Sequence, residues 1–120
     1  MIDNTTPMFI QIKEKIKDDI MAGVYQVDEL IISTTQIAKF FSVNPATAVK
    51  SVSFLQDEGI VYKKKGIGMC VSQEAKNLII KERTTQFYNQ VIITAVEEAK
   101  KLGITKGQLI QIIKEINDYD

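Results

Sequence analysis

Two short segments of this sequence carry side chains and backbone groups that suit contact with anionic or polar partners. The first is 44-NPATAVKS-51, in which Asn44 and Pro45 form a start signal for a helix and small side chains follow. Backbone N–H groups at a helix start favour a phosphate, and Lys50 lies one turn further on. The second segment is the run Lys63-Lys64-Lys65. Together they predict a surface that approaches phosphates and base edges closely.

The first segment must be positioned by helices, and residues 33–58 predict a helix, a turn of about three residues and a second helix. Ser33 and Gln36 match the capping box that would start the first of them. The second is predicted to begin at Pro45 and to end at Gly59. The side chains expected to face inward are Ile37, Ala38, Phe41, Ala48, Val52 and Leu55.

The lysine run must be positioned by a β-hairpin with strands over 60–64 and 68–72. Before the two helices, residues 8–22 predict an amphipathic helix and residues 24–32 an extended or irregular segment. The apolar stripe of the helix over 8–22 is Phe9, Ile12, Ile16 and Ile20. The solvent face of this helix is expected to be Lys13, Lys15, Lys17 and Asp18. A hairpin after the second helix is the wing of a winged helix. Residues 1–73 are therefore predicted to be a winged helix-turn-helix domain.

Residues 74–120 differ in character, with one long helix predicted over 75–102 and another over about 106–118. Two helices are too few to bury their broad apolar face alone, so the face needs a partner, either the winged helix of the same chain or the same tail of another chain. A two-fold dimer is the commonest solution for such a surface. The predicted dimer interface comprises Ile80, Phe87, Tyr88, Val91, Ile92, Ala95, Leu102, Leu109, Ile112, Ile113 and Ile116. The predicted fold class is mainly α with a small β-hairpin, a winged helix-turn-helix domain followed by a C-terminal two-helix dimerisation tail.

Composition narrows the class of protein. The chain has 120 residues, no histidine, one cysteine and a formal net charge of zero. Without histidine or a nucleophile paired to a base we expect no enzyme, no cofactor and no metal site. No apolar run approaches the roughly 18 residues of a membrane span, and a single Cys70 favours a cytoplasmic location. Because the net charge is zero, a basic footprint must be local, and residues 44–56 and 60–72 contain no acid.

The segments 7-PMFIQIKEKIKDDIMAGVY-25 and 37-IAKFFSVNPATAVKSVSFLQDEGIVYKKKGIGMCV-71 resemble the winged helix of the GntR family of bacterial transcription regulators. The start Asn44-Pro45-x-Thr47 and the short tail resemble its YtrA subfamily. The resemblance implies a homodimeric, DNA-binding repressor, often of a transporter operon near its own gene. The family's Leu-Pro-Ser-x-Arg element is 31-IISTT-35 here, so Thr35 replaces a DNA-contacting arginine, and Val27-Asp28 replaces a Pro-Gly turn.

We therefore predict that the partners are double-stranded operator DNA and a second copy of the chain. A small-molecule effector, if there is one, is expected at a domain or subunit interface. The predicted DNA-binding residues are Ser33, Thr34, Thr35, Asn44, Pro45, Ala46, Thr47, Lys50, Ser51, Lys63, Lys64, Lys65, Gly66 and Gly68. In a two-fold dimer these would meet a near-palindromic operator. The alternative is a winged-helix module that binds another protein and not specific DNA.

Overall fold

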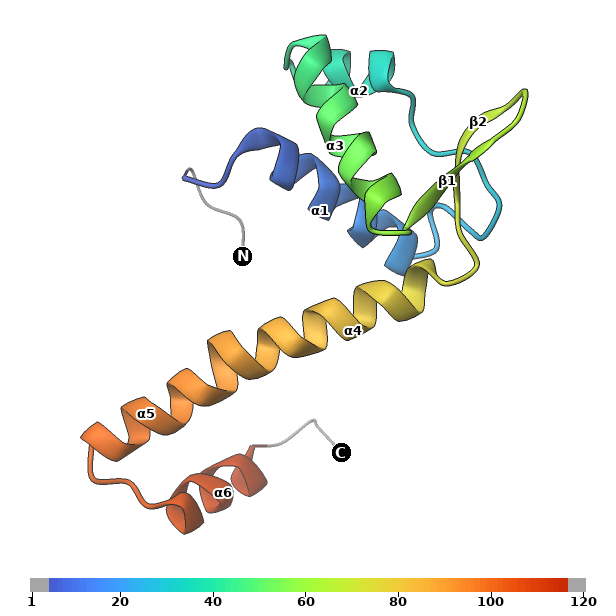
Figure 1. The fold of residues 1–120 in the computed structure, drawn as a ribbon. Coiled ribbons are helices and arrows are strands. Elements are labelled where there is room, and N and C mark those ends of the chain that lie inside the picture. The colour runs from blue at the N-terminus through green and yellow to red at the C-terminus, as the bar shows by residue number, and fades with distance from the viewer. Residues whose placement is uncertain (1–4, 117–120) are drawn as a thin grey trace. The chain divides into compact units, whose positions relative to one another are not determined.

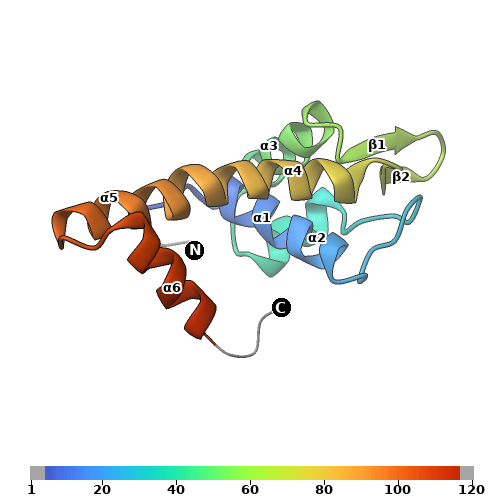
Figure 2. The same cartoon turned by 90° about the horizontal axis from the view of Figure 1, so that it is seen from below.

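A computed structural model describes residues 5–116, and the chain divides into two compact units, Met1–Ile80 and Lys81–Asp120. The elements of the first unit are α1 (Met8–Met21), α2 (Thr34–Phe40), α3 (Pro45–Asp57), β1 (Val61–Lys64), β2 (Gly68–Val71) and the start of α4 (Ala75–Phe87) (Figures 1 and 2). Those of the second are the end of α4, the π-helical η1 (Tyr88–Ile92), α5 (Ile93–Lys101) and α6 (Lys106–Glu115). The predicted class, mainly helical with one antiparallel hairpin, is confirmed.

The helix-turn-helix is started and stopped by the local signals that its sequence carries. Ser33 and Gln36 form the predicted capping box, with each side chain accepting a hydrogen bond from the other residue's backbone N–H. Asn44 caps α3 and Pro45 is its first residue. Gly59 follows the helix at a φ of 80°, as expected for a left-handed C-terminal position. Ser42, in the turn, also has a positive φ, 53°.

One apolar core joins every element of the first unit. Its buried members are Ile12, Ile16, Ile20, Ile31, Ile37, Ala48, Val52, Leu55, Ile60, Val61, Val71, Ala75 and Ile79. Because α4 contributes Ala75 and Ile79, its first turns belong to the winged-helix core. The functional boundary at 73/74 stays a prediction, and α4 spans the division between the two compact units.

The assignment of Lys17 to the solvent face of α1 is wrong. Its side chain is 1% exposed, and its ammonium lies 2.8 Å from Glu58 and 3.3 Å from Glu14. Glu58, at the C-terminal end of α3, also forms an ion pair with Lys13. A buried charge is tolerated only when it is paired, so this group of charges fixes α1 against the end of α3.

The hairpin is bordered by a segment that precedes α2. In the hairpin Val61 pairs with Val71 and Lys64 with Gly68. On the outer edge of β2, residues 28–31 add backbone hydrogen bonds, from the Asp28 and Ile31 N–H groups to β2 carbonyls and from the Val71 N–H to Glu29. The extended segment predicted over 24–32 therefore lies against β2 for part of its length.

The second unit buries very little. Ala99 is the one buried side chain of residues 81–116, although most of this segment is helical. The single helix predicted over 75–102 is interrupted by the π-helical turn at Tyr88–Ile92 and ends at Lys101. Thr105 caps α6 with a second capping box. Helix α6 ends at Glu115, and the part of its predicted range beyond residue 116 lies outside the described residues.

Candidate nucleic-acid interface

The start of α3 has fewer open backbone donors than its sequence suggested. Asn44 Oδ1 accepts hydrogen bonds from the Thr47 N–H at 3.2 Å and from the Thr47 hydroxyl at 3.3 Å. Pro45 has no N–H, so the Ala46 N–H is the first-turn donor without a hydrogen-bond partner within residues 5–116. This single N–H points outward, and the helix dipole strengthens it as a donor to an anion. The Thr47 hydroxyl must leave Asn44 before it can donate to a phosphate.

The assignment of Ser51 to the contact surface is wrong, because its side chain is completely buried. Its hydroxyl donates a 2.7 Å hydrogen bond to the carbonyl of Ala48, one turn earlier. Ser51 lies three residues after Ala48 and four before Leu55, both of which are in the core. The helical spacing therefore places Ser51 inward despite its polar side chain.

The outward face of α3 contains two residues that the sequence prediction missed. Val49 is 53% exposed and Ser53 is exposed as well. They follow Ala46 by three and seven residues, which puts them on its side of the helix. Counting from Ala46 at helical spacing would have found both. Over residues 45–54 the exposed residues of α3 are Pro45, Ala46, Val49, Lys50, Ser53 and Phe54.

The one long basic side chain of α3 is held by an aromatic ring. The ammonium of Lys50 lies 4.2 Å from the ring centroid of Phe9 in α1, within the range of a cation–π contact. The Phe9 ring in turn packs on Phe54 with 5.2 Å between centroids. Lys50 is thus directed along the α1 flank of α3, which suits a backbone phosphate beside the groove better than a base edge.

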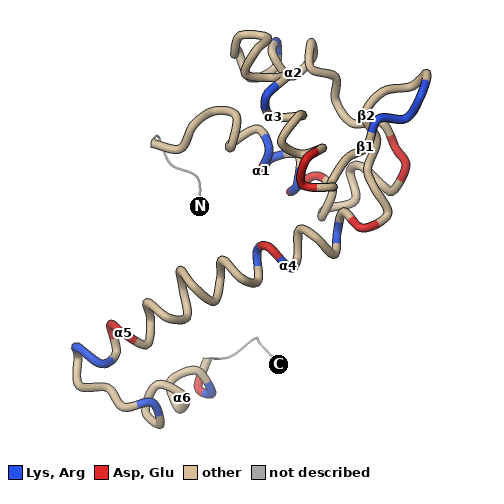
Figure 3. Tube along the Cα trace, viewed as in Figure 1, with Lys and Arg blue, Asp and Glu red and all other residues tan. Residues whose placement is uncertain are grey.

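The predicted basic hairpin places its cations on the surface. Lys63 and Lys65 are exposed and Lys64 is half-buried, and Figure 3 shows them as one continuous blue stretch on the hairpin. The Ile67 N–H closes the tip by donating to the Lys64 carbonyl at 3.0 Å. A Cβ at Gly68 would lie 2.9 Å from Leu30 Cδ1, the end of an exposed side chain that can move aside, so glycine is favoured there by its φ of 135°.

The segment before α2 shows how this chain accommodates its departures from the family pattern. Asp28, the residue for which the family resemblance implies a glycine, has a φ of 67°. Its carboxylate accepts a 2.7 Å hydrogen bond from the Tyr62 hydroxyl. Aspartate adopts this conformation more readily than most residues. The hydrogen bond to Asp28 raises the pKa of Tyr62 to about 12, so the phenol remains a donor. Among the predicted contacts, Ser33 serves as the α2 cap and Thr35 is exposed.

Acidic groups near α3 are gathered at its C-terminal end, away from the proposed contact surface. Asp57 is exposed, whereas Glu58 is engaged by Lys13 and Lys17. Burial raises the pKa of Glu58, but the hydrogen bonds from the two lysines outweigh it and hold the pKa below its usual value. Glu58 therefore stays ionised and neutralises α1 lysines rather than facing an approaching polyanion.

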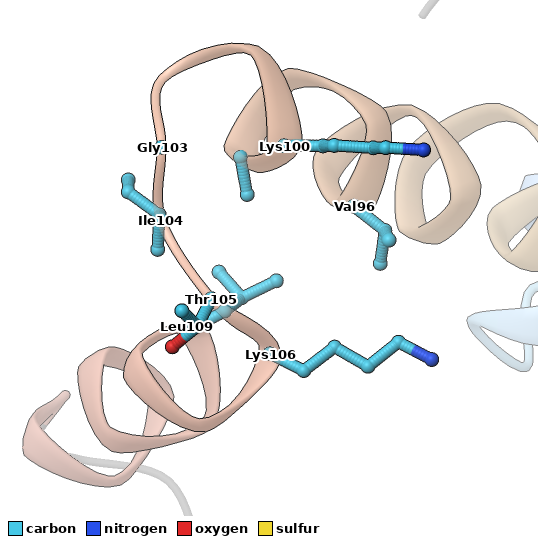
Figure 4. A pocket seen from close by; sticks show the side chains of 8 residues that line it. Val96, Lys100, Gly103, Ile104, Thr105, Lys106 and Leu109 are labelled. Atoms are coloured by element: carbon cyan, nitrogen blue, oxygen red, sulfur yellow. The ribbon is translucent and has the colours of Figure 1, made fainter.

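The second unit contains a pocket between α5 and α6, with a volume of about 520 Å³. Its apolar lining includes Val96, Ile104 and Leu109, and the side chains of Lys100 and Lys106 point toward the same side (Figure 4). Across residues 5–116 no group of three or more metal-ligating side chains occurs. Within the same range no helix has the length and apolarity to cross a bilayer.

Comparison with known proteins places the chain among transcription regulators, although no family model matches it. The repressor YtrA of Bacillus subtilis is 26% identical over 114 residues, which cover 95% of this chain and 87% of YtrA. AraR(DBD), solved in complex with operator ORR3, is 26% identical with a TM-score of 0.54 over 60% of this chain and 87% of that one. A GntR-family regulator from Bacteroides thetaiotaomicron is 30% identical with a TM-score of 0.75, over 91% of this chain and 95% of that one. The predicted resemblance is thus confirmed, and the chain belongs to the GntR family of transcription regulators.

Proposed function

We propose that this protein is a sequence-specific DNA-binding repressor that acts as a homodimer on a near-palindromic operator, such as one controlling a transporter operon. The observation that carries the proposal is the pairing, in one compact unit, of a small and exposed start of α3 with three lysines on a hairpin. The similarity to the repressor YtrA and to AraR(DBD) bound to an operator supports it.

In this proposal α3 enters the major groove with its N-terminal half toward the bases. Pro45, Ala46 and Thr47 are small enough to allow close approach, and the Ala46 N–H can donate to a phosphate. Lys63, Lys64 and Lys65 contact the backbone beside the groove. Gly66 gives the hairpin tip its turn, with a φ of 79°.

We further propose that the second unit joins two copies of the chain. Its predicted interface residues are largely exposed in the single chain, among them Phe87, Tyr88, Val91 and Ile113. Such a face is stable in water when it is covered, and a self-complementary two-fold contact covers it most simply. An effector would bind in the α5–α6 pocket, where Lys100 and Lys106 suit a ligand with a negative group.

The proposal is tested by a mobility shift assay with the full-length protein and the DNA upstream of its own gene. Binding should weaken steeply with salt, with a log–log slope of about −0.9 for each phosphate contact. The double variant Lys64→Ala/Lys65→Ala should bind all DNA more weakly and with a shallower slope. Lys101→Ala/Lys114→Ala, which removes two lysines of the second unit, is the matched control and should keep the wild-type slope.

Failure to shift any upstream fragment at low salt would reject DNA binding. The protein-interaction module would then be the better interpretation. Sedimentation at several concentrations separately tests the homodimer, which should be the main species at micromolar protein.

A further inference from the structure

The outward face of α3 has almost none of the side chains that usually read bases by hydrogen bonds. Residues 45–54 include no Arg, Asn, Gln, Asp or Glu. Ser51 is buried, the Thr47 hydroxyl is bound to Asn44, and Lys50 is drawn to Phe9. Apart from Lys50, the side chains that make bidentate contacts to guanine or adenine are therefore missing from residues 45–54.

The face presents methyl groups instead. Val49 exposes half of its surface and is absent from the residues that pack on the core, so no contact within the domain accounts for it. Ala46 places another methyl group one turn earlier on the same side. In a helix valine is largely confined to one χ1 rotamer, so the two methyl groups of Val49 have nearly fixed positions.

From this face we infer that Val49 determines specificity by packing against the C5-methyl group of a thymine in each half-site. That methyl is the apolar group that a T·A pair presents in the major groove, and it distinguishes thymine from the other standard bases. Because Val49 is already ordered, burying it against this methyl loses little side-chain entropy. Lys50 then contacts a phosphate on the Phe9 side of α3. The Phe9 ring restricts the lysine side chain, and Lys50 does not contact the bases. The inference rests on the proposed DNA binding and specifies how the same surface recognises sequence.

The experiment starts from duplexes that the full-length wild-type protein selects from a random library. Each thymine of the selected site is replaced in turn by uracil, which removes the methyl group and keeps every hydrogen bond. One thymine per half-site should lose about fourfold in affinity when replaced, the effect of withdrawing one methyl-sized group from an apolar contact. The Val49→Ala variant should bind the original site and the site with that thymine replaced by uracil with equal affinity.

Val24→Ala is the matched control, since Val24 is 62% exposed in the loop after α1 and lies outside the proposed contact surface. It should keep the full preference for thymine. Lys50→Ala should weaken binding to all sites and reduce the salt slope, while the thymine preference persists.

The outcomes separate the two proposals. If the library yields no enriched sequence, DNA recognition itself is wrong and the inference falls with it. If sites are enriched but no thymine is sensitive to uracil, or the sensitivity survives in Val49→Ala, then Val49 is not the reader and the proposed repressor function stands.

Discussion

The two compact units use apolar side chains in opposite ways. In the first, helices and hairpin enclose one core, and isoleucines 12, 16, 20 and 37 are almost entirely hidden from solvent. In the second, residues 81–116 bury one alanine and leave side chains such as Phe87, Val91 and Ile113 exposed. The first unit carries its own stabilising core, whereas the second needs a covering surface. In the proposed repressor, the DNA-contact surface would therefore be complete within one chain, and dimerisation would set how many such surfaces act together.

The largest expected effect comes from placing a charge on the exposed apolar face of the second unit. If the proposed homodimer forms, Phe87→Asp should convert it into monomers and lower operator affinity by about 100- to 10,000-fold, because two linked half-site contacts become independent. Sedimentation and mobility shifts measure the two effects. Gln86→Asp adds the same charge at an exposed polar position and should change neither. A dimeric Phe87→Asp protein would show that the interface lies elsewhere.

Shortening a buried side chain of the first unit should instead lower the stability of that unit. Leu55 is completely buried at the junction of α3 with the core, and Leu55→Ala should lower the free energy of unfolding by about 3 kcal/mol. Chemical denaturation followed by circular dichroism measures this loss. Ile113→Ala, at an exposed position of α6, should leave the unfolding of the first unit unchanged. Equal losses for the two variants would remove the distinction between a self-sufficient and a partner-dependent unit.

The ion pairs that join α1 to α3 predict how the first unit responds to acid. Folding lowers the pKa of Glu58. Its ionised carboxylate therefore contributes fully to the free energy of unfolding at any pH above 4.5, the ordinary pKa of a glutamate. This contribution is lost as the pH falls through the lower pKa of the folded state. Glu58→Gln should cost about 1 kcal/mol at pH 7, after allowance for partial solvent screening.

The same variant should flatten the dependence of stability on pH below 4.5. Denaturation curves recorded from pH 7 to pH 3 check both points. A variant as stable as the wild type at pH 7 would mean that Lys13 and Lys17 are neutralised by other groups.

The smallest expected effect concerns the turn between α2 and α3. Ser42 has a φ of 53°, where an L-residue with a Cβ is strained and glycine is not. Ser42→Gly should raise the free energy of unfolding by about 0.5 kcal/mol, since relief of strain exceeds the entropy that glycine adds to the unfolded chain. Ser53→Gly, within α3, should instead lower it by about 0.5 kcal/mol. A loss of stability in Ser42→Gly would show that the serine side chain supports the turn.

Sequence predicted those parts of the fold that depend on neighbours along the chain. The capping box at Ser33 and the Asn44-Pro45 start of α3 are local, and each lies where it was predicted. The burial of Lys17 was missed because Glu58, which is nearer to its ammonium than Glu14 is, lies far away in sequence. Lysine spacing alone could not reveal that pair.

The contact surface was predictable in outline but not residue by residue. The hairpin lysines are exposed as expected, and Lys50 is too, but its contact with Phe9 depends on how α1 packs on α3. Ser51 was assigned by its polarity, although its spacing from Ala48 and Leu55 places it inside. Val49 was left out of the predicted contacts, although its spacing from Ala46 places it on the exposed face of α3. The π-helical turn at Tyr88–Ile92 carries no local signal that we could identify.

The hydrogen bonds between residues 28–31 and β2 have a consequence for solubility. They occupy the outer edge of β2, so among the described residues β1 is the strand whose outer edge has no strand partner. An open edge is a template for pairing with another chain, and charged side chains on it prevent such pairing. Lys63 and Lys64 lie on this strand and Lys65 follows it, so we expect these lysines to protect the hairpin against aggregation as well. A chain stripped of all three would be expected to precipitate before its DNA affinity could be measured, so two should be removed at most.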